Sequence, residues 1–193
     1  MADIIVAGNT SGSVTISAPS VAGSTVLTLP VIAADTLAGI AATQTLTNKT
    51  LGAGTVFPAG AVLQVVSATY SVSTTNSTGT YADTGLTATI TPTSASSKIL
   101  VIVDQAGLQA NTTSNGIDLI LLRGATSLIK FASLYSYVPI NTPMGASCNY
   151  LDSPATTSAT TYKTQFLRNS GAGTVFTQAN TPTSTIVLME IQG

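Results

Sequence analysis

The chain has 193 residues, only 7% of them charged, and its formal net charge is −1. About a quarter of the residues in an ordinary soluble domain are charged, so little electrostatic repulsion keeps copies of this chain apart. The six Lys and Arg residues are scattered, which excludes a basic nucleic-acid-binding face. One interpretation is a soluble but sticky domain. We favour a subunit covered by its neighbours, because interface cores are depleted in charge.

The apolar runs at 99–103 and 119–122 are strand-sized, whereas a membrane-spanning helix needs about 20 apolar residues. The sequence begins Met1-Ala2-Asp3, without the basic and apolar regions of a secretory signal. The single cysteine, Cys148, cannot form an intrachain disulfide, and we expect it to be a buried, inert thiol. These features predict no membrane insertion and assembly in a reducing cytoplasm.

Residues 1–57 contain short candidate strands at 4–7, 13–17 and 25–29, with a hairpin connection between the last two. So few short strands bury too little apolar area to fold alone. We therefore expect an extended N-terminal β attachment segment that is held by a partner.

Residues 58–193 are rich in strand formers and poor in surface helix formers, which predicts an all-β fold. Clusters of turn-forming residues at 73–79, 110–116, 139–145 and 169–173 predict loops. The pattern favours a two-sheet sandwich, a jelly-roll-like knob. The candidate strands are 62–70, 86–91, 98–104, 117–123, 128–138, 147–151, 161–168, 174–178 and 184–191.

Two of these strands lack polar alternation, which predicts that both of their faces are covered. In an antiparallel sandwich one face packs on the core, so the other needs another layer or another subunit. The resulting candidates for a subunit interface are Ile99, Val101, Val103, Ile186 and Leu188.

The residue types that carry most enzyme chemistry are scarce. The chain has no histidine, which excludes Ser-His-Asp and Cys-His nucleophiles and removes the commonest zinc ligand. Asp104 and Asp118 could meet across a sheet as a glycosidase-like carboxylate pair. Asp83 and Asp152 precede turn formers and are more typical of turns. We expect no catalytic residues, no metal and no cofactor.

Tyr135 and Tyr137 are spaced to share one face of a strand and are the candidates for contact with a glycan. Packing or an interface is the commoner use of tyrosine in such a position.

Several segments resemble those near the N-terminal parts of tailed-bacteriophage fibre and virion proteins. They lie at 12–19, 22–30, 35–39 and 43–51, and Thr-Leu-Thr-Asn-Lys-Thr-Leu at 45–51 is the most specific. The C-terminal part resembles a β-domain of marine and cyanobacterial phage structural proteins. The segments that carry this second resemblance lie at 90–101, 150–154, 160–163 and 184–191.

The resemblance implies a non-enzymatic virion surface protein, usually a homotrimer, that joins the capsid or tail through its N-terminal segment. Because the chain has no extended shaft, a short head fibre, a capsid decoration (cement) protein or a short tail spike is favoured. The alternative is a receptor-binding tail fibre or adhesin that contacts a host surface glycan. Assembly would take place in the host cytoplasm. The attachment candidates are Leu27, Leu29, Leu46, Asn48, Lys49 and Leu51.

Overall fold

The computed structural model of the chain describes residues 4–7, 13–16, 55, 57–136 and 140–193. The chain divides into two compact units, Met1–Gly52 and Ala53–Gly193, and each is described by itself. All regular secondary structure in the described residues is β-strand, which confirms the all-β prediction. The same residues contain no helix long and apolar enough to cross a membrane.

The described part of the first unit is one antiparallel pair. Strand β1 (Ile4–Ala7) pairs with β2 (Ser13–Ile16) so that Ile4 lies opposite Ile16. This confirms the strands predicted at 4–7 and 13–17. The strand predicted at 25–29, and with it the second hairpin, lies outside the described residues.

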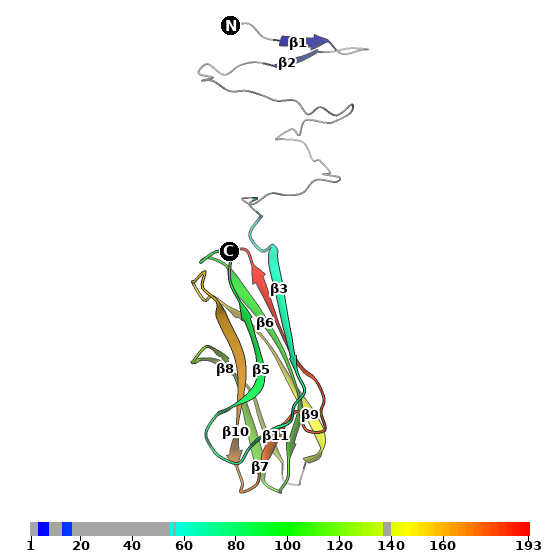
Figure 1. Cartoon of the computed structure of the whole chain (residues 1–193), viewed down its shortest axis with the longest axis vertical. Helices are drawn as coiled ribbons and strands as arrows, with labels where there is room; N and C mark the ends of the chain where they lie inside the picture. The colour runs from blue at the N-terminus through cyan, green and yellow to red at the C-terminus, as the bar shows by residue number, and fades with distance from the viewer. Residues whose placement is uncertain (1–3, 8–12, 17–54, 56, 137–139) are drawn as a thin grey trace. The chain divides into compact units, whose positions relative to one another are not determined.

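The second unit contains two antiparallel sheets (Figure 1). The larger sheet has the order β3-β12-β6-β11-β4, with β9 on the other edge of β6, and the smaller sheet has the order β5-β10-β7-β8. The strands are β3 (Val62–Tyr70), β4 (Thr74–Asn76), β5 (Ala82–Ile90), β6 (Lys98–Ala110), β7 (Asn115–Arg123), β8 (Thr126–Ser136), β9 (Ile140–Asp152), β10 (Thr160–Ser170), β11 (Val175–Thr177) and β12 (Ser184–Ile191).

The pairing of the eight long strands is nested. Leaving out the short β4 and β11, the first strand pairs with the last (β3 with β12) and the second with the seventh (β5 with β10). The third pairs with the sixth (β6 with β9) and the fourth with the fifth (β7 with β8). A long hairpin rolled up in this way gives the two facing sheets of a jelly roll, as predicted.

Two of the predicted loops contain strands. Strand β4 lies within the loop predicted at 73–79, and β9 begins at Ile140, inside the loop predicted at 139–145. Turn formers at 143 and 145 are tolerated because β9 pairs along one edge only and its register against β6 shifts there.

Inward-facing side chains from both sheets form two apolar clusters. The first includes Val101 of β6, Leu188 of β12 and Tyr162 of β10, all fully buried. The second includes Leu108 of β6 and Phe166 of β10. Strands β6 and β10 therefore contribute to both clusters.

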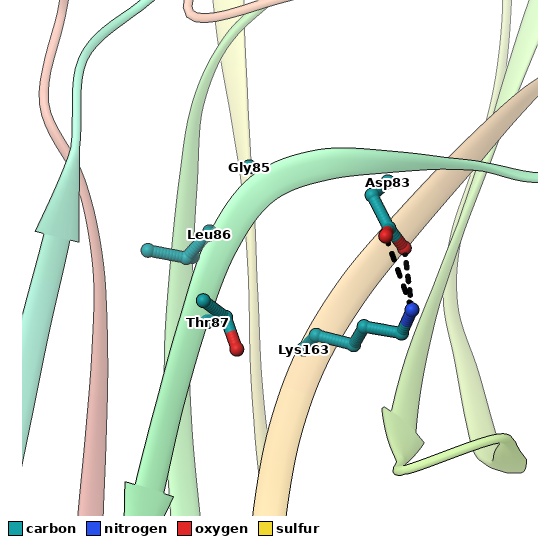
Figure 2. Close-up of a pocket in the computed structure, with 5 residues that line it drawn as sticks. All are labelled: Asp83, Gly85, Leu86, Thr87 and Lys163. Atoms are coloured by element: carbon teal, nitrogen blue, oxygen red, sulfur yellow. Dashed lines mark hydrogen bonds and ion pairs between the residues drawn. The ribbon is translucent and has the colours of Figure 1, made fainter.

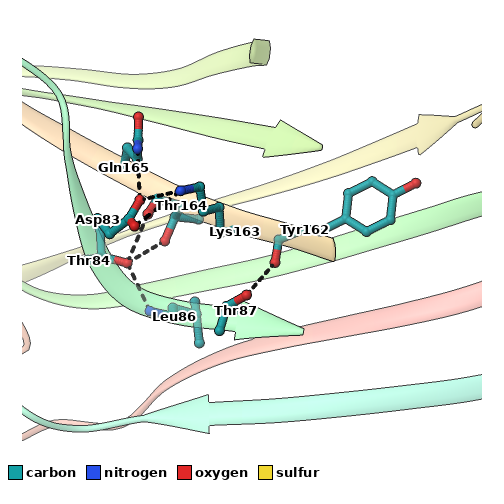
Figure 3. A network of polar contacts seen from close by, with 8 residues as sticks. All are labelled: Asp83, Thr84, Leu86, Thr87, Tyr162, Lys163, Thr164 and Gln165. Atoms are coloured by element: carbon teal, nitrogen blue, oxygen red, sulfur yellow. Dashed lines mark hydrogen bonds and ion pairs between the residues drawn. The ribbon is translucent and has the colours of Figure 1, made fainter. Parts of the chain in front are cut away.

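A belt of buried polar side chains separates the two clusters. Gln105 lies between Val103 and Leu108 on β6, and Thr164 lies between Tyr162 and Phe166 on β10. Thr164 Oγ1 donates to Gln105 Oε1 at 2.9 Å, and the hydroxyls of Thr164 and Thr84 are 2.6 Å apart (Figure 3). A buried polar group that loses its partner costs free energy, so these bonds fix how the sheets face each other.

Strand β6 bends at Gly107, which has a φ of 67° and marks a shift in the register against β9. A Cβ atom there would lie 2.6 Å from the backbone N of Ala179, because the backbone of Gln178 and Ala179 bonds to β6 at this point. Glycine is required both by the left-handed conformation and by this close approach.

We expect Gly107→Ala to lower the free energy of unfolding by roughly 2–5 kcal/mol, from backbone strain plus overpacking. Denaturant unfolding monitored by circular dichroism measures this change. Gly79→Ala is the matched control, since its new Cβ would have an ordinary contact at 3.9 Å. Equal stabilities of the two variants would contradict the requirement for glycine at position 107.

Candidate functional site

The two carboxylates proposed as a pair lie on opposite sides of the sandwich. Asp104 is on the outer face of the larger sheet, because Val101 and Val103 beside it fill the core. Asp118 is on the outer face of the smaller sheet, since its neighbours Ile117 and Leu119 point inward. The sandwich core separates the two groups, so they do not form an active-site pair.

Asp118 is held by neighbours on its own sheet. It accepts hydrogen bonds from Ser133 Oγ at 2.7 Å, Asn169 Nδ2 at 2.5 Å and Lys130 Nζ at 3.0 Å. Burial raises the pKa of this carboxyl, but the three donors outweigh burial and hold the pKa below its usual value. A carboxylate with this set of partners is a structural ion pair and a weak base.

The smaller sheet has a shallow hollow of about 120 Å³ lined by Asp83, Gly85, Leu86, Thr87 and Lys163 (Figure 2). It lies where residues 84–86 of β5 bulge opposite Thr164 of β10. Thr87 Oγ1 donates to the backbone O of Tyr162, and Asp83 pairs with Lys163 at 2.8 Å and accepts from Gln165 (Figure 3). The polar groups around the hollow are thus bonded to one another.

The prediction that Asp83 and Asp152 are turn residues is wrong for both. Asp83 lies in β5, where it pairs with Lys163 across to β10. Asp152 ends β9 and is buried, with Arg123 Nη1 at 2.8 Å and the Tyr162 hydroxyl donating at 2.6 Å. Their partners come from strands distant in sequence, so the local turn signal was misleading.

The tyrosines proposed for glycan contact are only partly described. Tyr135, near the end of β8, is 50% exposed and lies opposite Gly116 of β7. Tyr137 lies outside the described residues, as do the attachment candidates Leu27, Leu29, Leu46, Asn48, Lys49 and Leu51.

Cys148 is half-buried and packs against the first core cluster. Burial raises the pKa of its thiol to about 11, which keeps the group protonated and unreactive at neutral pH. Among the described residues, no group of three or more His, Cys, Asp and Glu side chains is arranged to hold a metal ion.

The five residues proposed for a subunit interface lie in the core of a single chain. Ile99, Val101, Val103, Ile186 and Leu188 are fully buried between the two sheets. The residues that alternate with them point outward. Any subunit interface on these strands would therefore be formed by Leu100, Ile102, Val187 and Met189.

These outward side chains belong to two rows that cross the larger sheet, of which the first is apolar throughout and the second only at its centre. One row runs in register from Val65 through Met189 and Leu100 to Leu151. Val65 is 55% exposed and Leu151 is 53% exposed. The next row contains Val187 beside Ile102. We call this surface, made of the outward residues of β3, β12, β6 and β9, the outer apolar face.

The outer apolar face also carries two charges, Lys98 and Asp104, which stand before and after Leu100 and Ile102 in the outward column of β6. Within the described residues, these are the two charged side chains without a hydrogen-bond or ion-pair partner. The smaller sheet has the opposite character, because its outer face carries the pairs Lys163–Asp83 and Lys130–Asp118. The two outer faces therefore differ in charge pairing.

Glu190, the last inward residue of β12, fastens the loop between β5 and β6. It is fully buried and accepts from the N and Oγ1 of Thr93, both at 2.7 Å, and from Gln64 Nε2 at 2.5 Å. Burial raises the pKa of this carboxyl, but the hydrogen bonds from Gln64 and Thr93 outweigh burial and lower the pKa below its usual value.

We expect Glu190→Gln to lower the free energy of unfolding at pH 7 by roughly 1–3 kcal/mol. A lowered folded-state pKa stabilises the fold above the ordinary glutamate pKa of about 4.3, and this contribution is lost as the pH falls through the folded-state value. The gap between wild type and variant should therefore shrink on acidification, as measured by denaturant unfolding from pH 7 to pH 3. Leu86→Ala, which removes a buried apolar side chain and no titratable group, is the control, and its loss of stability should be the same at every pH. A gap between wild type and Glu190→Gln that does not change with pH would contradict this role.

No protein-family model matches the chain, and no curated protein matches it. The chain is similar to VP2 of a subviral particle of infectious bursal disease virus (TM-score 0.41, 15% identity, 67% of this chain and 33% of that one). It is also similar to a protein of the Gx strain of that virus (0.41, 13%, 67% and 32%). A third similarity is to the disulfide-linked pili of Bacillus endospore appendages (0.34, 11%, 72% and 97%). The chain spans about a third of the length of these two viral chains.

Proposed function

We propose that this chain is a non-enzymatic structural protein of a tailed-bacteriophage virion, a surface fibre or capsid decoration subunit. It works as a homo-oligomer anchored by its N-terminal segment. The observation that carries the proposal is the outer apolar face, where Val65, Met189, Leu100 and Leu151 form a continuous row on a strand surface that no other described part of the second unit covers. Contiguous exposed apolar surface of this kind marks interaction sites.

The distribution of charge supports the same proposal. The chain carries 7% charged residues, and on the smaller sheet the charges neutralise one another in pairs. A surface built in this way suits close packing among neighbours, because burial of a charge that is already paired leaves no isolated charge to desolvate.

The fibre or decoration role and the copy number of three come from the resemblance of residues 12–51 and of the C-terminal strands to tailed-phage virion proteins. The short N-terminal pair β1–β2 agrees with a segment that depends on a partner. On this proposal the particle holds residues 1–57 in its capsid or tail, and the jelly roll faces the surroundings.

The first prediction concerns copy number. We expect the purified full-length protein to have a native mass that is a multiple of three times 19.4 kDa, by native mass spectrometry or light scattering. Ile102→Lys, which places a charge in the middle of the outer apolar face, should reduce association, whereas Thr89→Lys on the smaller sheet should not. A wild-type monomer at all concentrations would contradict the proposal.

The second prediction concerns attachment. A chain without residues 1–57 should keep the far-ultraviolet circular dichroism of a β-protein but fail to be incorporated into virions that carry the full-length protein. Immunoblotting of purified particles measures incorporation. Incorporation of the shortened chain at the full-length level would rule out N-terminal anchoring, and binding of the full-length protein on a glycan array would favour the receptor-binding alternative.

A further inference from the structure

The geometry points to a second copy of this chain as the partner of the outer apolar face, packed face to face with β6 antiparallel to β6 of that copy. This inference rests on the proposed function, because it specifies how the assembly surface is used. It depends on the order of the side chains along β6 and on the register of the strands beside it.

The outward column of β6 begins Lys98, Leu100, Ile102, Asp104 and continues with Ala106 before the bend at Gly107. In the first four positions a positive charge comes before the two apolar side chains and a negative charge comes after them. Lys98 and Asp104 are separated by about 20 Å of extended strand, at about 3.3 Å per residue, so they cannot pair within one chain. Both side chains are exposed, and neither has a hydrogen-bond or ion-pair partner among the described residues.

A twofold axis that lies between two facing sheets and runs across their strands reverses this column. Lys98 then lies over Asp104 of the partner subunit, and Leu100 lies over Ile102 of the partner subunit. A twofold axis along the strands would instead place Lys98 over the partner's Lys98. Facing sheets are about 10 Å apart, a gap that Lys and Asp side chains pointing toward each other can bridge. The charge order therefore selects the antiparallel arrangement.

The neighbouring columns are compatible with the same axis. On β12, Met189 would lie over Val187 of the partner subunit, so the two central columns make an apolar strip. On the flanking strands, Val65 would face Ser67 of the partner subunit, and Leu151 would face Asn149 of the partner subunit. An apolar centre with a mixed, more polar rim is the usual anatomy of a protein interface.

A twofold contact uses the same patch on both copies and cannot itself build a trimer. If three chains associate through other surfaces, this contact joins two such trimers. With the copy number of three proposed above, the expected species in solution therefore contains six chains, two trimers joined by this contact.

The experiment is a charge swap in the full-length protein. Each single variant, Lys98→Glu or Asp104→Lys, places like charges together twice in every pair of copies. We expect each to weaken association about tenfold, measured as the dissociation constant by analytical ultracentrifugation at low salt. The double variant restores both pairs and should return within about threefold of wild type. Lys163→Glu, on the smaller sheet, is the control and should leave association unchanged.

A carbodiimide gives a second readout, because it joins an amine to a carboxylate only where the two touch. Mixed ¹⁴N- and ¹⁵N-labelled protein should give a cross-link between Lys98 of one copy and Asp104 of the other. The cross-link would be found by mass spectrometry of the peptides.

The outcomes separate this inference from the proposed function. Weakened single variants with a restored double variant support antiparallel pairing. If Ile102→Lys reduces association but the charge swaps do not, the outer apolar face remains an assembly surface and the antiparallel pairing is wrong. A trimer whose mass responds to none of these variants overturns the pairing and leaves the trimer standing. A wild-type monomer overturns both.

Discussion

Strand β6 is the element on which the larger sheet depends, because it is paired along both edges. One edge pairs with β12 and, beyond the bend at Gly107, with β11, while the other pairs with β9. The same strand supplies side chains to both core clusters and the central residue of the polar belt, Gln105. A change in its register would exchange the inward and outward sets of side chains along the middle of the sandwich.

That constraint also determines what the protein presents on its surface. Because Ile99, Val101 and Val103 point inward, the remaining apolar residues of β6 must point outward. A strand with one face in the core and the other in solvent needs only one set of apolar side chains. Strands β6 and β12 carry two sets of apolar side chains, and the outward set is partly exposed. The sequence therefore keeps apolar side chains at positions where contact with solvent would favour polar ones. Contact with another protein gives a physical reason for them.

The buried polar groups have a different role, which is to fasten distant parts of the chain to one another. Glu190 holds the loop before β6, and Asp152 joins Arg123 of β7 to Tyr162 of β10. Gln105, Thr164 and Thr84 connect the two sheets between the apolar clusters. Each group has partners that are far away in sequence, so no local motif predicts it. The acidic residues of the second unit that the sequence offered for catalysis or for turns are largely explained by such contacts.

The sequence by itself determined the class of fold and the positions of most strands. The predicted strands 62–70 and 184–191 coincide with β3 and β12, because alternation and bounding turn residues are local signals. Their partners, by contrast, depend on the nested pairing of strands, which brings residue 62 opposite residue 191. The sequence also predicted that both faces of Ile99–Val103 are covered, and the structure shows one of them buried in the core, but the sequence did not indicate which face is inside. In an uninterrupted apolar run, either the odd-numbered or the even-numbered residues could face the core. Only the packing of β6 against Tyr162 and its neighbours across the core decides between the two.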